Sequence, residues 1–94
     1  MAMAIRVDVG GTETGVAGRV TRNGDPVQRA YIRVTDSDGE FVTEVWCGPA
    51  GEFRLNLRPG EWRLICLAPQ TRVERTLRLE AGDHADVDVL LQPA

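Results

Sequence analysis

The sequence contains no lysine, one serine (Ser37) and one histidine (His84) among its 94 residues. A nucleophilic hydrolase needs a serine or cysteine beside a general base, which is most often histidine. Ser37 lies in a segment, residues 36–39, whose composition is typical of a tight turn, and His84 follows the turn residues Gly82 and Asp83. Turn and loop chemistry explains both residues, so the sequence predicts no catalytic residue and no enzymatic activity of its own.

Only two cysteines are present, Cys47 and Cys66, and they are 19 positions apart. Neither has another cysteine or a histidine at zinc-binding spacing, and two cysteines are too few for a disulfide-rich scaffold. The sequence leaves open whether the two cysteines form one disulfide between neighbouring strands. The acidic segment at 36–40 lacks the other ligands of a calcium loop. The sequence therefore predicts no metal and no cofactor.

The charge balance argues against polyanionic partners. All 11 basic residues are arginine, 14 residues are acidic, the net charge is −3 and the pI is near 5.0. A negative chain repels nucleic acid, so nucleic-acid binding is not expected. No apolar run approaches the roughly 18–20 residues of a membrane span, and Arg6 and Asp8 interrupt the start where a signal peptide would be apolar. We expect a cytoplasmic protein.

A regular alternation of strand and turn patterns fills most of the chain. Turn residues cluster at 23–26, 36–39 and 58–60. Because no segment has an apolar period near 3.6 residues, helices are not expected. The pattern predicts an all-β antiparallel sandwich of seven strands in one domain, residues 1–94, with its core in residues 14–91. An extra N-terminal strand near residues 5–9 is left open. The seven strands are expected at 14–22, 30–35, 41–47, 52–57, 61–68, 72–79 and 85–91.

Alternation along each strand also predicts which side chains face the core. In the strand at 30–35, Ala30, Ile32 and Val34 face inward and the residues between them, Thr35 included, face outward. The strand at 41–47 is ambiguous, so its buried face is left open. The strand at 61–68 is apolar on both faces, which is typical of a central strand.

Five segments together resemble the carboxypeptidase regulatory-like domain: VAGRV at 16–20, GDPV at 24–27, AYIRV at 30–34, GEFRL at 51–55 and PGEWRL at 59–64. That family has a prealbumin-like (transthyretin-like) sandwich of seven strands and is usually a non-catalytic accessory module. The resemblance covers residues 14–69 and is specific for fold rather than activity. It implies that the Pro59-Gly60 turn directs Trp62 into the core.

A narrower resemblance involves DSDGEFVTEV at 36–45, GEFR at 51–54 and PGEW at 59–62. These segments are similar to a small actinobacterial family of unknown function that is often encoded beside thiosulfate sulfurtransferases. The resemblance implies a place in sulfur metabolism through a protein partner, with a thiosulfate sulfurtransferase as the first candidate. The implication comes from gene neighbourhood and not from chemistry within the chain.

Four residues are candidates for a functional site. Cys47 ends a strand beside Gly48 and Pro49, and we expect an accessible thiol there, whereas Cys66 alternates with core residues. Tyr31 and Trp46 are expected to expose aromatic surface. Arg75 interrupts the apolar face of its strand. Either that strand is an edge that reaches water, which we favour, or Arg75 pairs with a carboxylate of a partner.

These observations lead to two functional hypotheses. The first is a non-enzymatic accessory protein that binds a protein partner through an exposed sheet face or edge strand. The alternative is a carbohydrate- or small-ligand-binding module that uses the aromatic surface of Tyr31 and Trp46 for stacking.

Overall fold

The computed structural model describes residues 2–91, and within that range the chain forms nine β-strands and no helix. The described residues therefore contain no helix that could span a membrane. The predicted all-β class is confirmed. The strands are β1 (Ala2–Asp8), β2 (Gly15–Arg22), β3 (Asp25–Pro26), β4 (Tyr31–Thr35), β5 (Phe41–Trp46), β6 (Glu52–Asn56), β7 (Gly60–Ala68), β8 (Thr71–Leu79) and β9 (His84–Leu91).

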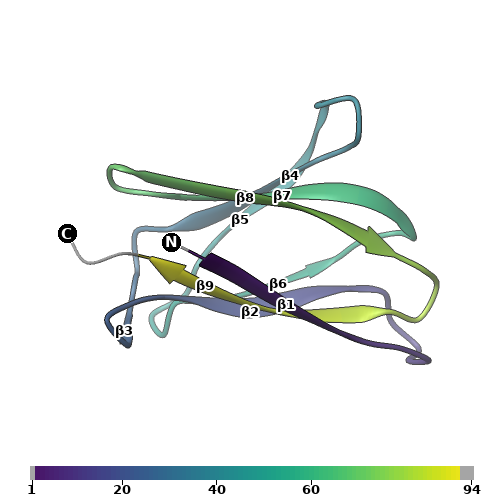
Figure 1. Ribbon diagram of the computed structural model, residues 1–94, viewed down its shortest axis with the longest axis horizontal. Helices are drawn as coiled ribbons and strands as arrows, with labels where there is room; N and C mark the ends of the chain where they lie inside the picture. Colours follow the sequence, from purple (N-terminus) through teal and green to yellow (C-terminus); the bar gives the residue numbers. More distant parts are fainter. Residues whose placement is uncertain (1, 92–94) are drawn as a thin grey trace.

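The strands form two sheets that stack face to face (Figure 1). One sheet has the order β1-β9-β2-β3, with β6 also paired to β2, and the other has the order β5-β4-β7-β8. All pairs are antiparallel except β2 with β9, which run parallel. The seven expected strands are β2 and β4 to β9. The N-terminal strand is also present, and the two-residue β3, which pairs back onto β2, was not expected.

Alternation along the strands builds the core between the sheets. Ala30, Ile32 and Val34 of β4 have no exposed surface, as the sequence predicted. Thr35, which alternation places on the outer face, is nevertheless buried, with 7% of its surface exposed. Gly18 of β2 is required for close packing, since a Cβ atom there would meet the backbone oxygen of Val87.

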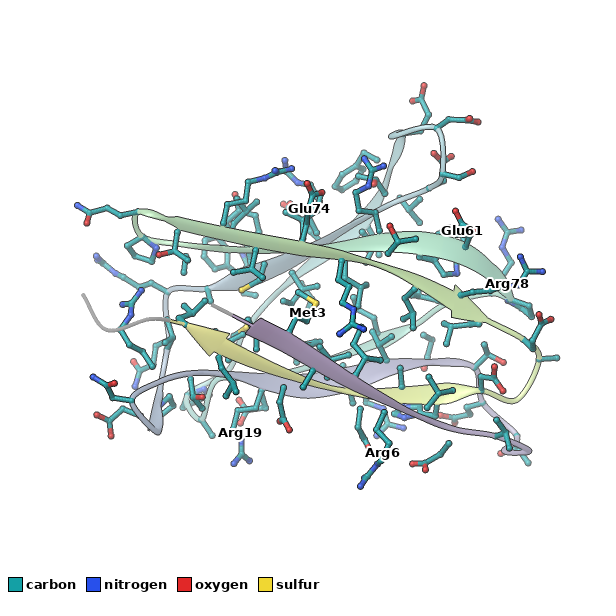
Figure 2. The ribbon with its side chains drawn as sticks, viewed as in Figure 1. Met3, Arg6, Arg19, Glu61, Glu74 and Arg78 are labelled. Carbon is teal, nitrogen blue, oxygen red and sulfur yellow. The ribbon has the colours of Figure 1, made fainter. Side chains whose placement is uncertain are left out.

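The N-terminal strand extends the core beyond the predicted range of 14–91. Met3 of β1 is 5% exposed and belongs to the core cluster, with Ile5 packed against it. Figure 2 shows Met3 between the two sheets. Val9, the last residue of the range 5–9 suggested for this strand, lies beyond the end of β1 and is 78% exposed. The buried face of β1 therefore starts earlier in the chain than the pattern suggested.

Strand β7 lies inside its sheet, between β4 and β8, as its apolar character on both faces predicted. Leu64 and Cys66 face the core, and Ile65 on the outer face is also buried. Ile65 lies opposite Arg33 on one side and Glu74 on the other. These two side chains form ion pairs on the outer face, Arg33 with Glu44 and Glu74 with Arg63 and Arg72. The neighbouring side chains are thus long enough to cover an apolar residue on a solvent-facing surface.

Arg75 lies on β8, which is an edge strand, so the interpretation that we favoured from the sequence is confirmed. Its register partner is Leu64, whose side chain is in the core, so Arg75 starts from the inner face of the sheet. The guanidinium then donates a hydrogen bond to the backbone carbonyl of Met3 on β1. Arg75 therefore joins the edge strands of the two sheets.

Trp62 packs at the rim of the core rather than inside it, which corrects the expectation that it enters the core. Its side chain is partly exposed and packs against the core cluster. The indole Nε1 donates a hydrogen bond to the carbonyl of Arg58, 2.9 Å away. The bond spans the turn at Pro59 and Gly60, so Trp62 fixes the entry into β7.

We predict that Trp62→Ala lowers the free energy of unfolding by about 2–3 kcal/mol, because the change removes part of the core and the bond to Arg58. Trp46→Ala is the matched control: Trp46 is 66% exposed, and its loss should cost below about 1 kcal/mol. Urea denaturation followed by circular dichroism measures both. Equal losses for the two variants would contradict this placement of Trp62.

A candidate interaction surface on the four-stranded sheet

The residues considered for catalysis lie on different sheets. Ser37 is in the exposed turn between β4 and β5, and His84 is the first residue of β9 in the five-stranded sheet. In that same turn one carboxylate oxygen of Asp36 accepts hydrogen bonds from the backbone N–H groups of Asp38 and Glu40, each 2.9 Å long. These bonds give Asp36 a structural role in the turn. Within residues 2–91, no group of three or more histidine, cysteine, aspartate or glutamate side chains could hold a metal ion.

The two cysteines lie in the core, which overturns the expected accessibility of Cys47. Cys47 is 8% exposed and Cys66 is fully buried, and both are free thiols. Cys47 follows β5, Cys66 is on β7, and β4 lies between these strands. Two strand spacings separate them by roughly 9–10 Å, whereas a disulfide needs Cα atoms within about 7 Å. The single bridge that the sequence left open would require neighbouring strands, and these cysteines are not on neighbouring strands.

Burial makes both thiols weak acids. Desolvation, with a smaller contribution from Glu52, raises the pKa of Cys47 to about 11. Desolvation, with a smaller contribution from Cys47, raises the pKa of Cys66 to about 12. The thiolate is the reactive form of cysteine. Near neutral pH both residues are therefore protonated and behave as small apolar core residues.

Tyr31 and Trp46 come together on the outer face of the four-stranded sheet. They are directly opposite each other on β4 and β5, with ring centroids 4.9 Å apart and ring planes tilted by 52°. The Arg33 guanidinium lies 5.8 Å from the centroid of the Tyr31 ring and also pairs with Glu44 at 3.3 Å. A cation over an aromatic ring and a tilted ring pair are both favourable arrangements. Two of the predicted interaction residues thus form one cluster.

Exposed apolar side chains continue from this cluster along β5. Phe41 is 60% exposed and Val42 is 41% exposed. A register shift at Val34 and Thr35 places Phe41 opposite Thr35, whose side chain is on the outer face. We call Tyr31, Phe41, Val42 and Trp46 the β5 patch. Residues 41 to 46 span roughly 16 Å along the strand, so the patch is long and narrow.

Arg75 is not part of the β5 patch. It lies on β8, at the opposite edge of the sheet, and starts from the inner face. Three strand spacings separate β5 from β8, which is roughly 14 Å. The structure therefore brings together Tyr31 and Trp46 and places Arg75 elsewhere. The sequence did not single out Phe41 and Val42, although the mixed polarity of their strand was a sign of unusual exposure.

The outer face of the five-stranded sheet carries a second surface feature. A shallow depression of about 340 Å³ is lined by Arg6, Arg19, Asp86 and Asp88, with Gly18 and Val87 completing it. Arg6 pairs with Asp86 at 2.9 Å; the Arg6 side chain is largely exposed and that of Asp86 about half exposed. In Figure 2, Arg6 and Arg19 extend away from the sandwich. Charges of both signs alternate here, so the depression favours neither an anion nor a cation.

The model of a family described as "Protein of unknown function (DUF1416)" matches residues 1–91. Two uncharacterized proteins of Mycobacterium tuberculosis, Rv0814c and Rv3118, are each 33% identical to the chain over 78 residues, which is 82% of this chain and 78% of theirs. An uncharacterized protein of Mycolicibacterium smegmatis is 32% identical over 78 residues, 82% of this chain and 87% of its own length. These relatives are actinobacterial.

We predict that a maleimide reagent at pH 7.5 modifies both native thiols at least about 100-fold more slowly than a free cysteine, because neither is exposed and both pKa values are raised. Cys47 should react before Cys66, since Cys47 lies at the end of a strand, where local opening is easiest. Mass spectrometry after timed quenching measures the order, and urea-unfolded protein is the control. Rapid modification of either native thiol would contradict the burial described above.

The same thiols predict a pH dependence of stability. Their pKa values in the folded chain, about 11 and about 12, exceed the usual value near 8.5. The folded state therefore holds these protons more tightly, and stability is fully present below the unfolded pKa and decreases as the pH rises through the folded values. Between pH 8 and pH 10.5, Cys66→Ala should lose less stability than the unmodified protein in urea titrations. An identical loss in both proteins would contradict the assignment.

Proposed function

The chain belongs to the DUF1416 family of unknown function, and we propose that it is a non-enzymatic accessory protein that binds another protein through the β5 patch. The main observation behind this proposal is that most of the aromatic residues lie on the surface and not in the core. The chain has only five, and three of them, Tyr31, Phe41 and Trp46, belong to the patch. A small sandwich that needs apolar residues for its core here exposes large ones.

The composition of the β5 patch supports a protein partner. Tyrosine, tryptophan and arginine are enriched at the energetic centres of protein interfaces. Tyr31 links the other two side chains: its ring pairs with the ring of Trp46, and the Arg33 guanidinium lies over it. The Arg33–Glu44 ion pair and the Tyr31–Trp46 ring contact already orient these side chains, so binding would cost less side-chain entropy.

The identity of the partner is a separate proposal that rests on the sequence resemblance to a family encoded beside thiosulfate sulfurtransferases. This resemblance supports the proposals that such an enzyme of the same organism is the first partner to test and that the protein acts in sulfur metabolism. The contribution of this chain would be contact and not chemistry, because both thiols are buried and protonated.

Carbohydrate binding is the alternative function, and Trp46 is the observation that favours it. Its indole is largely exposed and could stack on a sugar ring. Two features argue against it. The neighbouring Tyr31 ring is tilted by 52° and so does not extend a flat platform. The polar groups beside it, Arg33 and Glu44, are paired with each other.

The decisive experiment is co-purification with the tagged full-length chain from its own host, in three forms: unmodified, Trp46→Ala and Leu90→Ala. Leu90 is a matched control because it is 50% exposed on the other sheet. We expect a stoichiometric protein partner that the Leu90→Ala protein retains and the Trp46→Ala protein loses. A partner that all three forms retain would contradict the assignment to the β5 patch, and binding on a glycan array in place of any protein would favour the alternative.

The sulfurtransferase itself can be tested directly with purified proteins. We expect binding with a Kd below about 10 µM, in the range of specific complexes, and sulfurtransferase turnover that changes when this chain is added. The chain alone should show no turnover. Absence of binding at tens of micromolar, about −6 kcal/mol or weaker, would remove the sulfurtransferase as a partner.

A further inference from the structure

The edge strands of the described chain differ in how they avoid pairing with other molecules. Edges are normally protected by charge, by proline, by short length or by inward-pointing charged residues. Strand β8 has several charged residues, and one of them, Arg75, lies on the inner face of the sheet. The Arg75 guanidinium also donates a hydrogen bond to the backbone carbonyl of Met3 on edge strand β1. Strand β3 has only two residues, one of which is Pro26. These features protect β8 and β3, and Arg75 occupies one backbone carbonyl of β1. Edge strand β6, which pairs with β2, is protected by the charged residues Glu52 and Arg54.

Apart from the register shift near Phe41, which is a bulge at one end of the strand, strand β5 lacks these protections. Its six residues include one charged side chain, Glu44, and no proline. The charge of Glu44 is already compensated within the chain by Arg33, at 3.3 Å. Three of the other residues, Phe41, Val42 and Trp46, are apolar and exposed. A hydrophobic edge of this length is a site at which another strand can add to the sheet.

The register identifies the backbone groups that are free on β5. Across β4 and β5 the N–H of Cys47 donates to the carbonyl of Ala30 at 2.9 Å, so this is a hydrogen-bonded position of the ladder. Hydrogen-bonded and non-hydrogen-bonded positions alternate along an antiparallel pair. Thr43 and Val45 are therefore bonded to β4, whereas the N–H and C=O groups of Glu44 and Trp46 point away from the sheet. An incoming strand would bond to these two residues.

Charge next to this edge indicates the chemistry of the incoming strand. The turn that precedes β5 carries Asp36, Asp38 and Glu40. No carboxylate of these residues is in an ion pair with another described residue. The end of β5 at Phe41 is thus acidic and uncompensated, while the end at Trp46 is aromatic. A complementary segment has apolar residues along the patch and basic residues at the end that meets the turn.

We propose that the free edge of β5 binds an extended segment of a partner protein as an additional antiparallel strand, with basic residues at the C-terminal end of that segment against the Asp36–Glu40 turn. This inference rests on the proposed function, since it specifies how the β5 patch binds. Antiparallel pairing gives the direction: the C-terminal end of the added strand lies beside Phe41. The apolar side chains of the segment then pack on Val42 and Trp46.

A second copy of the chain fits this edge less well. Two β5 strands related by a twofold axis can pair Val42 of one copy with Trp46 of the other. In that register Glu44 lies directly opposite its own counterpart, and like charges at such positions are destabilising. The acidic turns of both copies would also remain uncompensated. A foreign basic segment has neither disadvantage.

The test uses the full-length protein and three synthetic peptides with blocked ends. The probe is Thr-Val-Thr-Val-Thr-Val-Arg-Arg; one control replaces both arginines with glutamate, and another has the arginines at the N-terminal end. Amide hydrogen exchange by NMR is the readout. We expect the probe to slow exchange at Glu44 and Trp46 by at least about tenfold, because these amides gain hydrogen bonds. Thr43 and Val45, already bonded to β4, serve as internal references.

Matched variants separate the backbone contribution from the charge contribution. Glu44→Pro removes an N–H that points to solvent and should abolish binding, whereas Glu44→Gln keeps this N–H, loses only the ion pair with Arg33 and should weaken binding far less. Asp38→Asn with Glu40→Gln should weaken binding of the probe by about tenfold at low salt. The same number of charges removed from the other sheet, Asp8→Asn with Asp88→Asn, should weaken it far less. Circular dichroism confirms that each variant is folded.

Each outcome decides between the models. Equal affinity for the arginine and glutamate peptides, or no protection of Glu44 and Trp46 by the probe, overturns the inference. Protection that rises with protein concentration alone identifies a second copy as the occupant and also overturns it. If a partner protein depends on Trp46 for binding while the Glu44 and Trp46 amides still exchange rapidly, the proposed function stands and only the strand addition fails.

Discussion

The pairing of β4 with its two neighbours is the constraint on which the rest of the four-stranded sheet depends. Ala30, Ile32 and Val34 have no exposed surface, so β4 cannot rotate or slip by one residue without exposing all three. The residues between them must then face outward. For that reason Tyr31 of β4 lies opposite Trp46 of β5, and Arg33 lies opposite Glu44. The position of the proposed binding surface therefore follows from the burial of the alternate residues of β4.

Most of the fold could be predicted from the sequence because the information is local. Alternation and turn residues mark most strands, and in β4 they also mark the buried face, with Ala30, Ile32 and Val34 in the core. The partition into two sheets could not be predicted, because it depends on pairing between distant segments, such as the parallel pair β2 and β9. The two-residue β3 is too short to give a strand pattern of its own. The burial of Met3 and Thr35 was not predicted either, because it comes from neighbours on other strands and not from their own sequence context.

The candidate site was partly predictable. Tyr31 and Trp46 were expected on the surface, and the register places them side by side. Phe41 was not recognised, because simple alternation gives it the same face as Val45, and the register shift at Val34 and Thr35 changes that face. Cys47 was misplaced because a residue at a strand end next to Gly48 and Pro49 suggests exposure. The chain there crosses from one sheet to the other, and the thiol is buried between them.

The position of β9 bears on the order in which the chain can assemble during synthesis. Strand β9 is the last strand, yet it lies between β1 and β2, the first two. Neighbouring segments pair early in β4 with β5 and in β7 with β8, whereas contacts between distant segments form late. On the ribosome β1 has no partner in its own sheet until residues 84–91 have left the exit tunnel. The four-stranded sheet, with its exposed β5 edge, is therefore the part of the molecule that is complete first.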